Sequence, residues 1–429
     1  MYPDFYHLLK DIFGISIPIL SLFKTFGFLV AISFFAAAYI LMKELKRKED
    51  DGTISYQIEE ITIGKKAKPI DFISNFIIGF LLGYKMIGMF LSFKETSHDP
   101  LNFILSLKGN FVAGLVLGLV LLAYKAYTEY QNKDKKEETK KVKVSPYTRV
   151  GDIAVISAIG GFAGAKIFNA FETWDSFIKD PLGSLFSSSG LTFYGGLIVA
   201  TIALWYYSKK IKLDFRHLCD AAAPALILAY GLGRLGCQIS GDGDWGIFNS
   251  AYITDLNTYK VVKATKPFKE SVLDYQQYLK AEFDDIENIP HKSINAPSFL
   301  PTFLFAYNYP KNVNNVGIAM NGIDDDYNAV LPIPVFPTPI YELAMCLVIF
   351  SILWSIRKKI TTPLSIFSIY LILNGIERFF IEQLRVNSKY DLGFIQPTQA
   401  EIIAVLISIT GIILYSLRNK IDFKLKNIN

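Results

Sequence analysis

Apolar runs close to the length of a membrane helix constrain this chain more than any other feature. Nine such runs occur, at about 22–42, 72–93, 111–124, 153–170, 193–207, 220–239, 341–356, 364–380 and 400–417. A helix that crosses a bilayer needs about 20 mainly apolar residues, and 51% hydrophobic residues is a high share for a soluble chain of 429 residues. The runs therefore predict an all-α polytopic membrane protein with about nine transmembrane helices.

The positions of Lys and Arg residues orient these predicted helices. Basic clusters follow the first, third, fifth, seventh and ninth runs, whereas the connections after the second and fourth runs hold few basic residues. Because short cytoplasmic loops carry an excess of Lys and Arg, the N-terminus is expected outside and the C-terminus inside. The charged stretch 132–144 (NKDKKEETKKVKV) is then expected to be a solvated loop on the inner side.

A long polar region separates the sixth and seventh runs and is interpreted as a folded extramembrane insert of mixed structure. The chain is thus divided into N-terminal spans with an apparent added helical hairpin and a basic cytoplasmic loop (1–150), core spans (151–246), the insert (247–336) and C-terminal core spans (337–429). Within the insert, the aromatic and Asn-rich stretch 303–316 (FLFAYNYPKNVNNV) either contacts a protein partner or forms a plain folded loop.

An arginine in the sixth apolar run points to an anionic partner. Arg234 lies in the stretch 231–246 (GLGRLGCQISGDGDWG), where the sequence is still hydrophobic. A guanidinium group keeps its charge and is costly to bury in a bilayer, so it needs a negative group beside it. In the stretch 374–387 (NGIERFFIEQLRVN), Arg378, Glu382 and Arg385 have i, i+4, i+7 spacing and share one helix face.

The predicted topology brings several polar residues to the same outer side of the membrane. Arginine binds phosphate groups through paired, charge-assisted hydrogen bonds, so this surplus of arginines suits the phosphate of a phospholipid. An intramembrane ion-pair network that only sets the helix register is the alternative. The residues concerned are Tyr194, Arg234, Glu342, Arg378, Glu382 and Arg385.

Four ordered motifs resemble those of the bacterial prolipoprotein diacylglyceryl transferases. The segment 233–246 (GRLGCQISGDGDWG) resembles the family's GRxGNFxNGExxG, with one extra residue near 242–244. The segments 193–199 (FYGGLIV), 337–342 (PTPIYE) and 378–385 (RFFIEQLR) resemble its FHGGLxG, PxQLYE and RFxxExxR motifs. Each match alone is weak, but together and in order they are specific.

The resemblance implies transfer of an sn-1,2-diacylglyceryl group from phosphatidylglycerol to the lipobox cysteine of a prolipoprotein signal peptide. The thioether forms and glycerol phosphate leaves, in the bacterial cytoplasmic membrane, without a metal or an organic cofactor. The three cysteines and four histidines are widely spaced, which also favours neither a disulfide framework nor a metal cluster. The expected partners are therefore the lipid, the signal peptide and the bilayer, with no nucleic acid.

The family's site residues carry over to matching positions of this chain. Arg234 and Arg378 are expected to hold the phosphate and stabilise its charge as it leaves, with Glu382 orienting the arginines. Asp242 stands where the family has Glu, and Tyr194 completes the expected catalytic set. The expected substrate-binding set also contains Arg385, Gly195, Gly196, Gly246, Phe26, Cys237, Tyr341 and Glu342.

Three positions depart from the family pattern. Tyr194 replaces the family's His, Cys237 its Asn, and Phe26 the Tyr of the first span. A phenol has an ordinary pKa of about 10 and is a poor base at neutral pH. The proton acceptor for the substrate thiol is therefore unassigned, with Tyr194 and Asp242 as the candidates. A respecialised, non-catalytic lipid-binding relative is the alternative function. A transporter is disfavoured, because it usually has repeated halves and polar groups at the membrane midplane.

Overall fold

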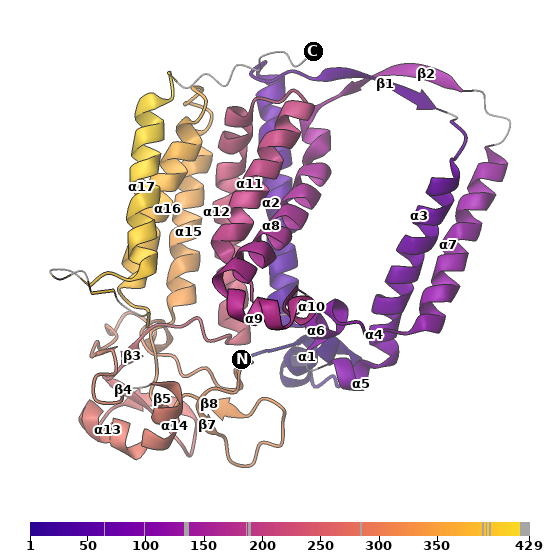
Figure 1. Cartoon of the computed structure of the whole chain (residues 1–429). Helices are drawn as coiled ribbons and strands as arrows, with labels where there is room; N and C mark the ends of the chain where they lie inside the picture. The colour runs from indigo at the N-terminus through magenta and orange to yellow at the C-terminus, as the bar shows by residue number, and fades with distance from the viewer. Residues whose placement is uncertain are drawn as a thin grey trace. The chain divides into compact units, whose positions relative to one another are not determined.

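Two compact units make up the chain in the computed structural model. The structure describes residues 1–63, 65–97, 99–132, 137–185, 187, 190–283, 285–387, 390–391, 393 and 396–420. The first unit comprises Met1–Ser16, Phe23–Leu41 and Arg216–Asn429, and the second comprises Ile17–Leu22 and Met42–Phe215. Figure 1 shows the elements of both units, which are described separately.

Among the described residues, seven helices are long and apolar enough to cross a membrane. They are Thr25–Asp50 (α2), Pro69–Leu91 (α3, η2 and α4), Phe111–Gln131 (α7), Pro146–Glu172 (η3 and α8), Phe215–Ser240 (α12), Thr338–Ile356 (α15) and Gln399–Leu417 (α17). The expectation of a polytopic, mostly helical membrane protein is confirmed. The third apolar run, only 111–124, lies in a helix of 21 residues that is long enough to span.

The two other predicted spans are also helices, but they are less apolar. Phe193–Lys210 (α11) ends on two lysines, and Ser365–Glu382 (α16) carries Glu377, Arg378 and Glu382. In their own units, α11 packs along α8 and α16 packs along α17 (Figure 1). A Cβ on Gly375 of α16 would lie 2.5 Å from the Ala404 carbonyl oxygen of α17, so the absence of a side chain permits this close approach.

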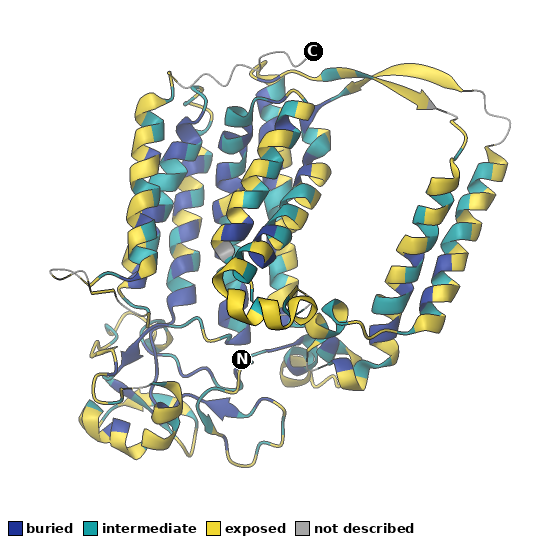
Figure 2. Ribbon diagram, in the orientation of Figure 1, coloured by how far each residue is buried: buried dark blue, intermediate teal, exposed yellow. Residues whose placement is uncertain are grey.

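The membrane part of the first unit has a core between α12, α15 and α16. Apolar side chains on one face of each helix are buried against the others, whereas α17 is exposed along much of its length (Figure 2). This pattern suits helices whose outer faces contact lipid instead of water. The buried cluster consists of Ala223, Ile227, Cys346, Ile349, Leu353 and Ile366.

The segment between α12 and α15 has mixed α and β structure. Its short strands are Phe248–Asn249 (β3), Tyr252–Asp255 (β4), Lys260–Lys263 (β5), His291–Lys292 (β6), Ile318–Ala319 (β7) and Ala329–Val330 (β8). They pair as β3–β6, β4–β5 and β7–β8, and Phe268–Asp274 (α13), Gln276–Glu282 (α14) and Thr302–Leu304 (η4) complete the insert. Its own core contains Phe248, Val272, Leu279, Ile289, Tyr309, Leu331, Ile333 and Val335. The helix Phe5–Phe13 (α1) also belongs to this unit.

The second unit corrects one prediction. Residues 138–144 form a strand, Glu138–Val144 (β2), and not a loop, although the strand is solvent-exposed as expected. It pairs antiparallel with Gln57–Ile63 (β1), where Glu60 lies opposite Lys141. Sequence reasoning missed β1, the partner that satisfies the backbone of this charged segment; residues 133–136 of the predicted loop lie outside the described residues.

In the second unit, α3, η2 and α4 pair with α7 as a helical hairpin. Contacts within this hairpin explain how a lysine is accommodated inside an apolar run. Lys85 lies in the π-helical turn Gly83–Ile87 (η2), and its Nζ donates to the carbonyl oxygens of Phe103, Ser106 and Lys108. These carbonyls belong to the connection that contains Phe93–Thr96 (α5) and Pro100–Leu105 (α6). Pro18–Leu22 (η1), Trp174–Lys179 (α9) and Pro181–Leu185 (α10) are the remaining short helices of this unit.

Candidate functional site

Arg234 projects from the last third of α12 between two carboxylates. Its Nε lies 3.1 Å from Oε2 of Glu342 in the first turns of α15, and its Nη1 bonds to Asp244 in the loop after α12. The guanidinium group also lies over the ring of Tyr230, 5.2 Å from the ring centroid. The anionic partner expected for Arg234 is therefore present, and two carboxylates share that role.

Glu342 is the central carboxylate of this cluster. Its side chain is fully buried and accepts a hydrogen bond of 2.8 Å from the Tyr230 hydroxyl. Oε1 also lies 3.5 Å from Nη1 of Arg378 and 3.6 Å from Nη1 of Arg385. Three arginines thus surround one buried carboxylate, which satisfies the requirement that a buried charge be paired.

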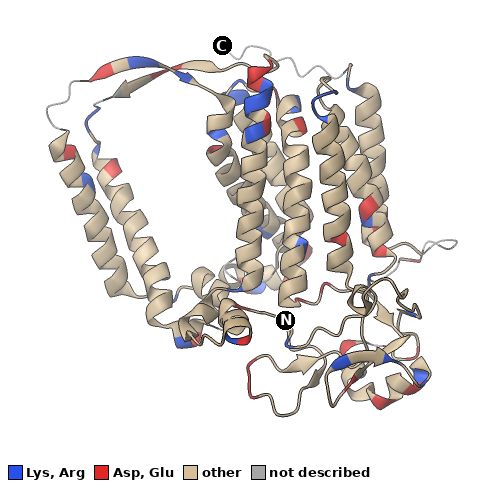
Figure 3. Ribbon diagram, turned by 180° about the vertical axis from the view of Figure 1, so that it is seen from behind, with Lys and Arg blue, Asp and Glu red and all other residues tan. Residues whose placement is uncertain are grey.

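The α16 face has the arrangement that its spacing predicts. Arg378 contacts Glu382 one turn later, with Nη2 and Oε2 2.8 Å apart, and Arg385 contacts Asp244. The other Glu382 oxygen accepts hydrogen bonds from the side chains of Thr398 and Asn387. Figure 3 shows that charges along the helices are sparse away from their ends, so this cluster is a distinct feature of the membrane region.

Asp244, and not Asp242, is the loop carboxylate that contacts the arginines. Its two oxygens bond separately to Arg234 and Arg385. Asp242 instead accepts a hydrogen bond from the Asp244 backbone at 3.2 Å. The extra residue in this motif leaves the sequence match ambiguous between the two aspartates, so sequence reasoning missed Asp244.

The loop that carries these aspartates is shaped by glycines. Gly241 and Gly243 have φ angles of +66° and +94°, in the region that favours glycine. A Cβ on Gly246 would lie 2.6 Å from the carbonyl oxygen of Leu384, two residues beyond the end of α16. Gly246 therefore permits the close contact that holds the Asp244 loop beside Arg385.

The pKa values of the two aspartates move in opposite directions. Burial acts to raise the pKa of Asp244, but the charges and hydrogen bonds of Arg385 and Arg234 outweigh it and hold that pKa below its usual value. Burial, aided by the charge of Asp244, raises the pKa of Asp242. Asp244 is thus suited to a permanent ion pair, and Asp242 is the better proton acceptor of the two.

The last turn of α12 and the loop after it bring a thiol and two carboxylates together. Donor atoms of Cys237, Asp242 and Asp244 all lie within 4.8 Å of one another, a spacing that a metal ion could use. Both Asp244 oxygens already contact guanidinium groups, whose positive charge opposes a cation there. The Cys237 Sγ lies 3.8 Å from Nη1 of Arg234, so this buried thiol packs directly against the cluster.

Phe26 and Tyr341 were also expected to bind substrate. Among the described residues, neither side chain makes a polar contact with the arginines or carboxylates of the cluster. Phe26, near the start of α2, packs against Gly236 of α12. The Tyr341 hydroxyl donates to the Leu304 carbonyl oxygen of the insert, so its polar end is directed to the insert. Tyr230 was not expected from the sequence, although its position one helical turn before Arg234 is a signal that could have found it.

Tyr194, Gly195 and Gly196 belong to the second unit, in the first turn of α11. Cβ atoms on Gly195 and Gly196 would lie 2.6 and 2.7 Å from the carbonyl oxygens of Gly164 and Gly161 in α8. These glycines therefore allow α11 and α8 to pack closely. The expected part of Tyr194 in the site stays a prediction.

Comparison with known proteins gives a family match over most of the chain. A model of the family described as prolipoprotein diacylglyceryl transferase matches residues 109–417. The chain is similar to the phosphatidylglycerol–prolipoprotein diacylglyceryl transferase of Leptospira interrogans, with 33% identity over 124 residues, which cover 24% of this chain and 39% of that protein. The match to the Clostridium novyi enzyme of the same description is 26% identical over 282 residues, or 65% of this chain and 84% of that protein.

These matches confirm the resemblance inferred from the four motifs. The chain spans only about two fifths of the Leptospira relative, and the match to a Dehalococcoides mccartyi relative spans 36% of that protein's length at 36% identity. The family match begins before α7 and leaves out α2 and α3. The interpretation of the second and third spans as an added hairpin therefore stays a prediction.

Proposed function

The chain belongs to the prolipoprotein diacylglyceryl transferase family, and on that premise we propose that it transfers a diacylglyceryl group from phosphatidylglycerol to the lipobox cysteine of prolipoproteins. The observation that carries the proposal is the convergence of Arg234, Arg378 and Arg385 around Glu342. Each guanidinium has five N–H donors in a fixed fork, so donors remain for a phosphate after the carboxylates are bound.

The proposed reaction is a displacement at the glyceryl carbon that bears the phosphate ester. The lipobox sulfur forms a bond to that carbon, the carbon–oxygen bond breaks, and glycerol phosphate leaves with the electron pair. Arg234 and Arg378 stabilise the charge that grows on the leaving phosphate. Glu382, Asp244 and Glu342 hold these arginines in place, and Arg385 supports Asp244.

The thiol proton is proposed to pass to Asp242, whose raised pKa suits proton uptake. Tyr194 then acts as a hydrogen-bond donor to the lipid phosphate and not as the base. Phe26, Cys237, Tyr341 and Gly246 are carried over from the family motifs as substrate-binding residues of the first unit, and Gly195 and Gly196 as those of the second. The nucleophile belongs to the substrate, so the chain needs no Ser/His or Cys/His pair of its own.

The proposed topology has nine spans, the seven apolar helices together with α11 and α16. The alternation of basic connections supports an N-terminus outside, a C-terminus inside and the 247–336 insert outside. The phospholipid donor and the lipoprotein acceptor then meet at the outer side of a bacterial cytoplasmic membrane.

A lipidation assay tests the activity. Purified protein receives phosphatidylglycerol and a lipobox peptide, and mass spectrometry measures the peptide; the matched control peptide has Ser in place of the lipobox Cys. The proposal expects a diacylglyceryl mass increment on the Cys peptide alone, with release of glycerol phosphate. Binding of phosphatidylglycerol without any increment would instead support the respecialised lipid-binding relative.

A further inference from the structure

A loop of the insert exposes large apolar side chains to its surroundings. In residues 294–305, here called the apolar loop, Phe299 is 82% exposed, and Leu300 and Phe303 are also partly or largely exposed. From Ser293 through Pro310 the sequence has no Asp, Glu, Lys or Arg. Such a concentration of exposed apolar surface marks an interaction site.

The apolar loop is held in shape at its base. The Nδ2 of Asn249, a fully buried residue, donates to the carbonyl oxygens of Ile294 at 2.8 Å and Phe305 at 3.0 Å. Its Oδ1 accepts from the Ile294 backbone at 3.1 Å. One side chain therefore clamps both ends of the loop, so the exposed side chains are displayed by an ordered segment and are not part of a loose tail.

The loop is also tied to the end of a membrane helix. Leu304, next to Phe303, accepts a hydrogen bond from the Tyr341 hydroxyl in the first turns of α15. Tyrosines are enriched at the membrane–water boundary, and α15 continues from there with exposed apolar residues such as Leu347 and Val348. The loop is therefore held by a hydrogen bond at the start of a helix whose exposed apolar residues suit contact with lipid.

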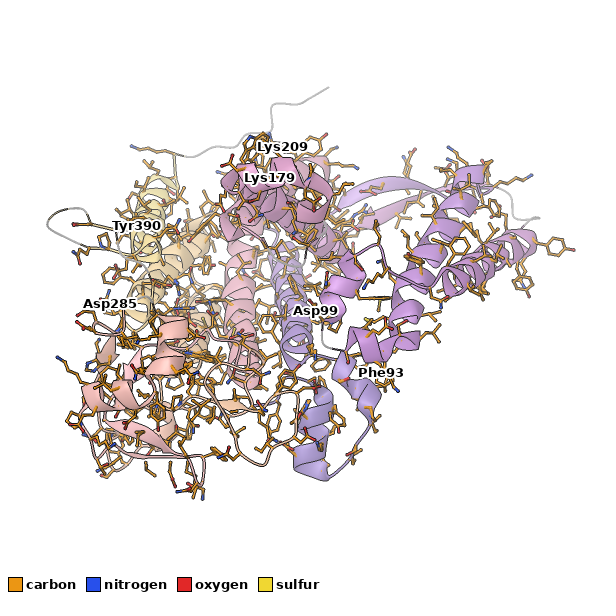
Figure 4. All side chains as sticks on the ribbon, turned by 60° about the horizontal axis from the view of Figure 1, so that its bottom comes forward. Phe93, Asp99, Lys179, Lys209, Asp285 and Tyr390 are labelled. Atoms are coloured by element: carbon orange, nitrogen blue, oxygen red, sulfur yellow. The ribbon has the colours of Figure 1, made fainter. Side chains whose placement is uncertain are left out.

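We propose that the apolar loop inserts Phe299, Leu300 and Phe303 into the bilayer interface beside the start of α15. Burial of aromatic and aliphatic side chains at the headgroup–acyl boundary stabilises such contacts. The loop then anchors the insert to the membrane surface. Elsewhere the surface of the insert carries charges, such as exposed Asp285 (Figure 4), which stay in water.

A fluorescent probe on the loop tests this contact in the full-length protein. Phe299→Cys is labelled with a polarity-sensitive dye in vesicles of phosphatidylcholine and phosphatidylglycerol, with Leu273→Cys on α13 as the matched control because Leu273 is an equally apolar surface residue, 60% exposed. The unsubstituted protein is treated with the same dye, and its fluorescence is subtracted as background. We expect a blue-shifted emission and strong quenching by nitroxide-labelled lipid at 299 only.

Equal quenching at the two positions, or none at 299, would overturn the proposal. Protection of the 299 probe only after a lipobox peptide is added would also overturn it, because the loop would then contact the peptide. A second readout uses the unsubstituted protein: a lipid-borne photoreactive reagent should modify residues 294–305 and spare α13 and α14. Neither measurement depends on transferase activity, so failure of this proposal can be distinguished from failure of the proposed function.

Discussion

Arg234 in α12 and Glu342 in α15 form an ion pair, with Nε and Oε2 3.1 Å apart, although the whole 247–336 insert separates them in the sequence. Glu342 is fully buried, so the pair cannot be replaced by water without a large cost. The contact joins two helices and fixes the plane of the Arg234 guanidinium. A guanidinium that is already oriented needs little reorganisation to receive a phosphate.

Replacement of Arg234 tests its part in phosphate binding. We expect Arg234→Ala to lower the transfer rate by about 10²-fold or more, the usual effect of removing a donor to developing charge. Arg234→Lys keeps the charge but loses the paired donors, so it should recover only part of the rate. The lipidation assay measures both, with Arg149→Ala as the control because Arg149 pairs with Glu59 in the second unit. Normal rates in both Arg234→Ala and Arg378→Ala would contradict the phosphate assignment.

Neutralisation of Glu342 should weaken the fold as well as the activity. In Glu342→Gln, three arginines lose a shared buried anion, and breaking a buried pair costs about 3–5 kcal/mol. We expect a lower thermal midpoint in detergent and loss of transfer. Glu282→Gln, on α14 in the exposed part of the insert, is the control. An unchanged midpoint would mean that the cluster is held together without Glu342.

The apolar runs located the helices, because lipid selects for length and hydrophobicity directly. The ends of the helices were harder to predict from the sequence. Helix α2 continues through the charged residues up to Asp50, and polar turns beyond the bilayer carry no hydropathy signal. The β1–β2 pair was missed for a related reason. Both strands are exposed and charged, so they lack the buried face that marks a strand in sequence.

The site was partly predictable for a similar physical reason. The Arg378–Glu382 contact follows from i, i+4 spacing on one helix, and Arg234 was identified because a guanidinium in an apolar run is costly. The central place of Glu342 and the choice of Asp244 depend on how α12, α15, α16 and the loop meet. That information is tertiary, and no local pattern contains it.

The two loop aspartates should differ when each is neutralised. Asp244→Asn removes an ion-pair partner from Arg234 and Arg385, so we expect a higher KM for phosphatidylglycerol. Asp242→Asn removes the proposed proton acceptor. We therefore expect kcat to fall by about 10²-fold and no longer to increase with pH. Kinetics over a pH series separate the two effects. The same change in both variants would show that the aspartates act only as one structural unit.

His7 of α1 is expected to make stability depend on pH. Its Nδ1 and Nε2 lie 2.5 and 2.8 Å from Asp4 and Asp325, with Lys24 and Lys10 also facing these aspartates. Burial acts to lower the pKa of His7, but the hydrogen bonds and charges of Asp4 and Asp325 outweigh it and raise that pKa.

A raised pKa stabilises the fold fully below the unfolded value of about 6.5, and this contribution is lost as pH rises through the folded value. The gap in thermal midpoint between the unsubstituted protein and His7→Gln should therefore be widest in mild acid and narrow in base. Midpoints measured across that range check the trend. A gap that stays constant would show that His7 acts through packing alone.

Tyr194→Phe separates the two proposed parts of the phenol. If the hydroxyl donates one hydrogen bond to the lipid phosphate, its loss should lower the transfer rate by about tenfold, because a hydrogen bond to a charged group contributes about 1.5 kcal/mol. If the phenol were the base, the loss should reach about 10²–10⁴-fold and change the pH profile. We expect the smaller loss with an unchanged profile. Tyr206→Phe, an exposed tyrosine on the same helix, is the control, and a rate equal to that of the control would remove Tyr194 from the mechanism.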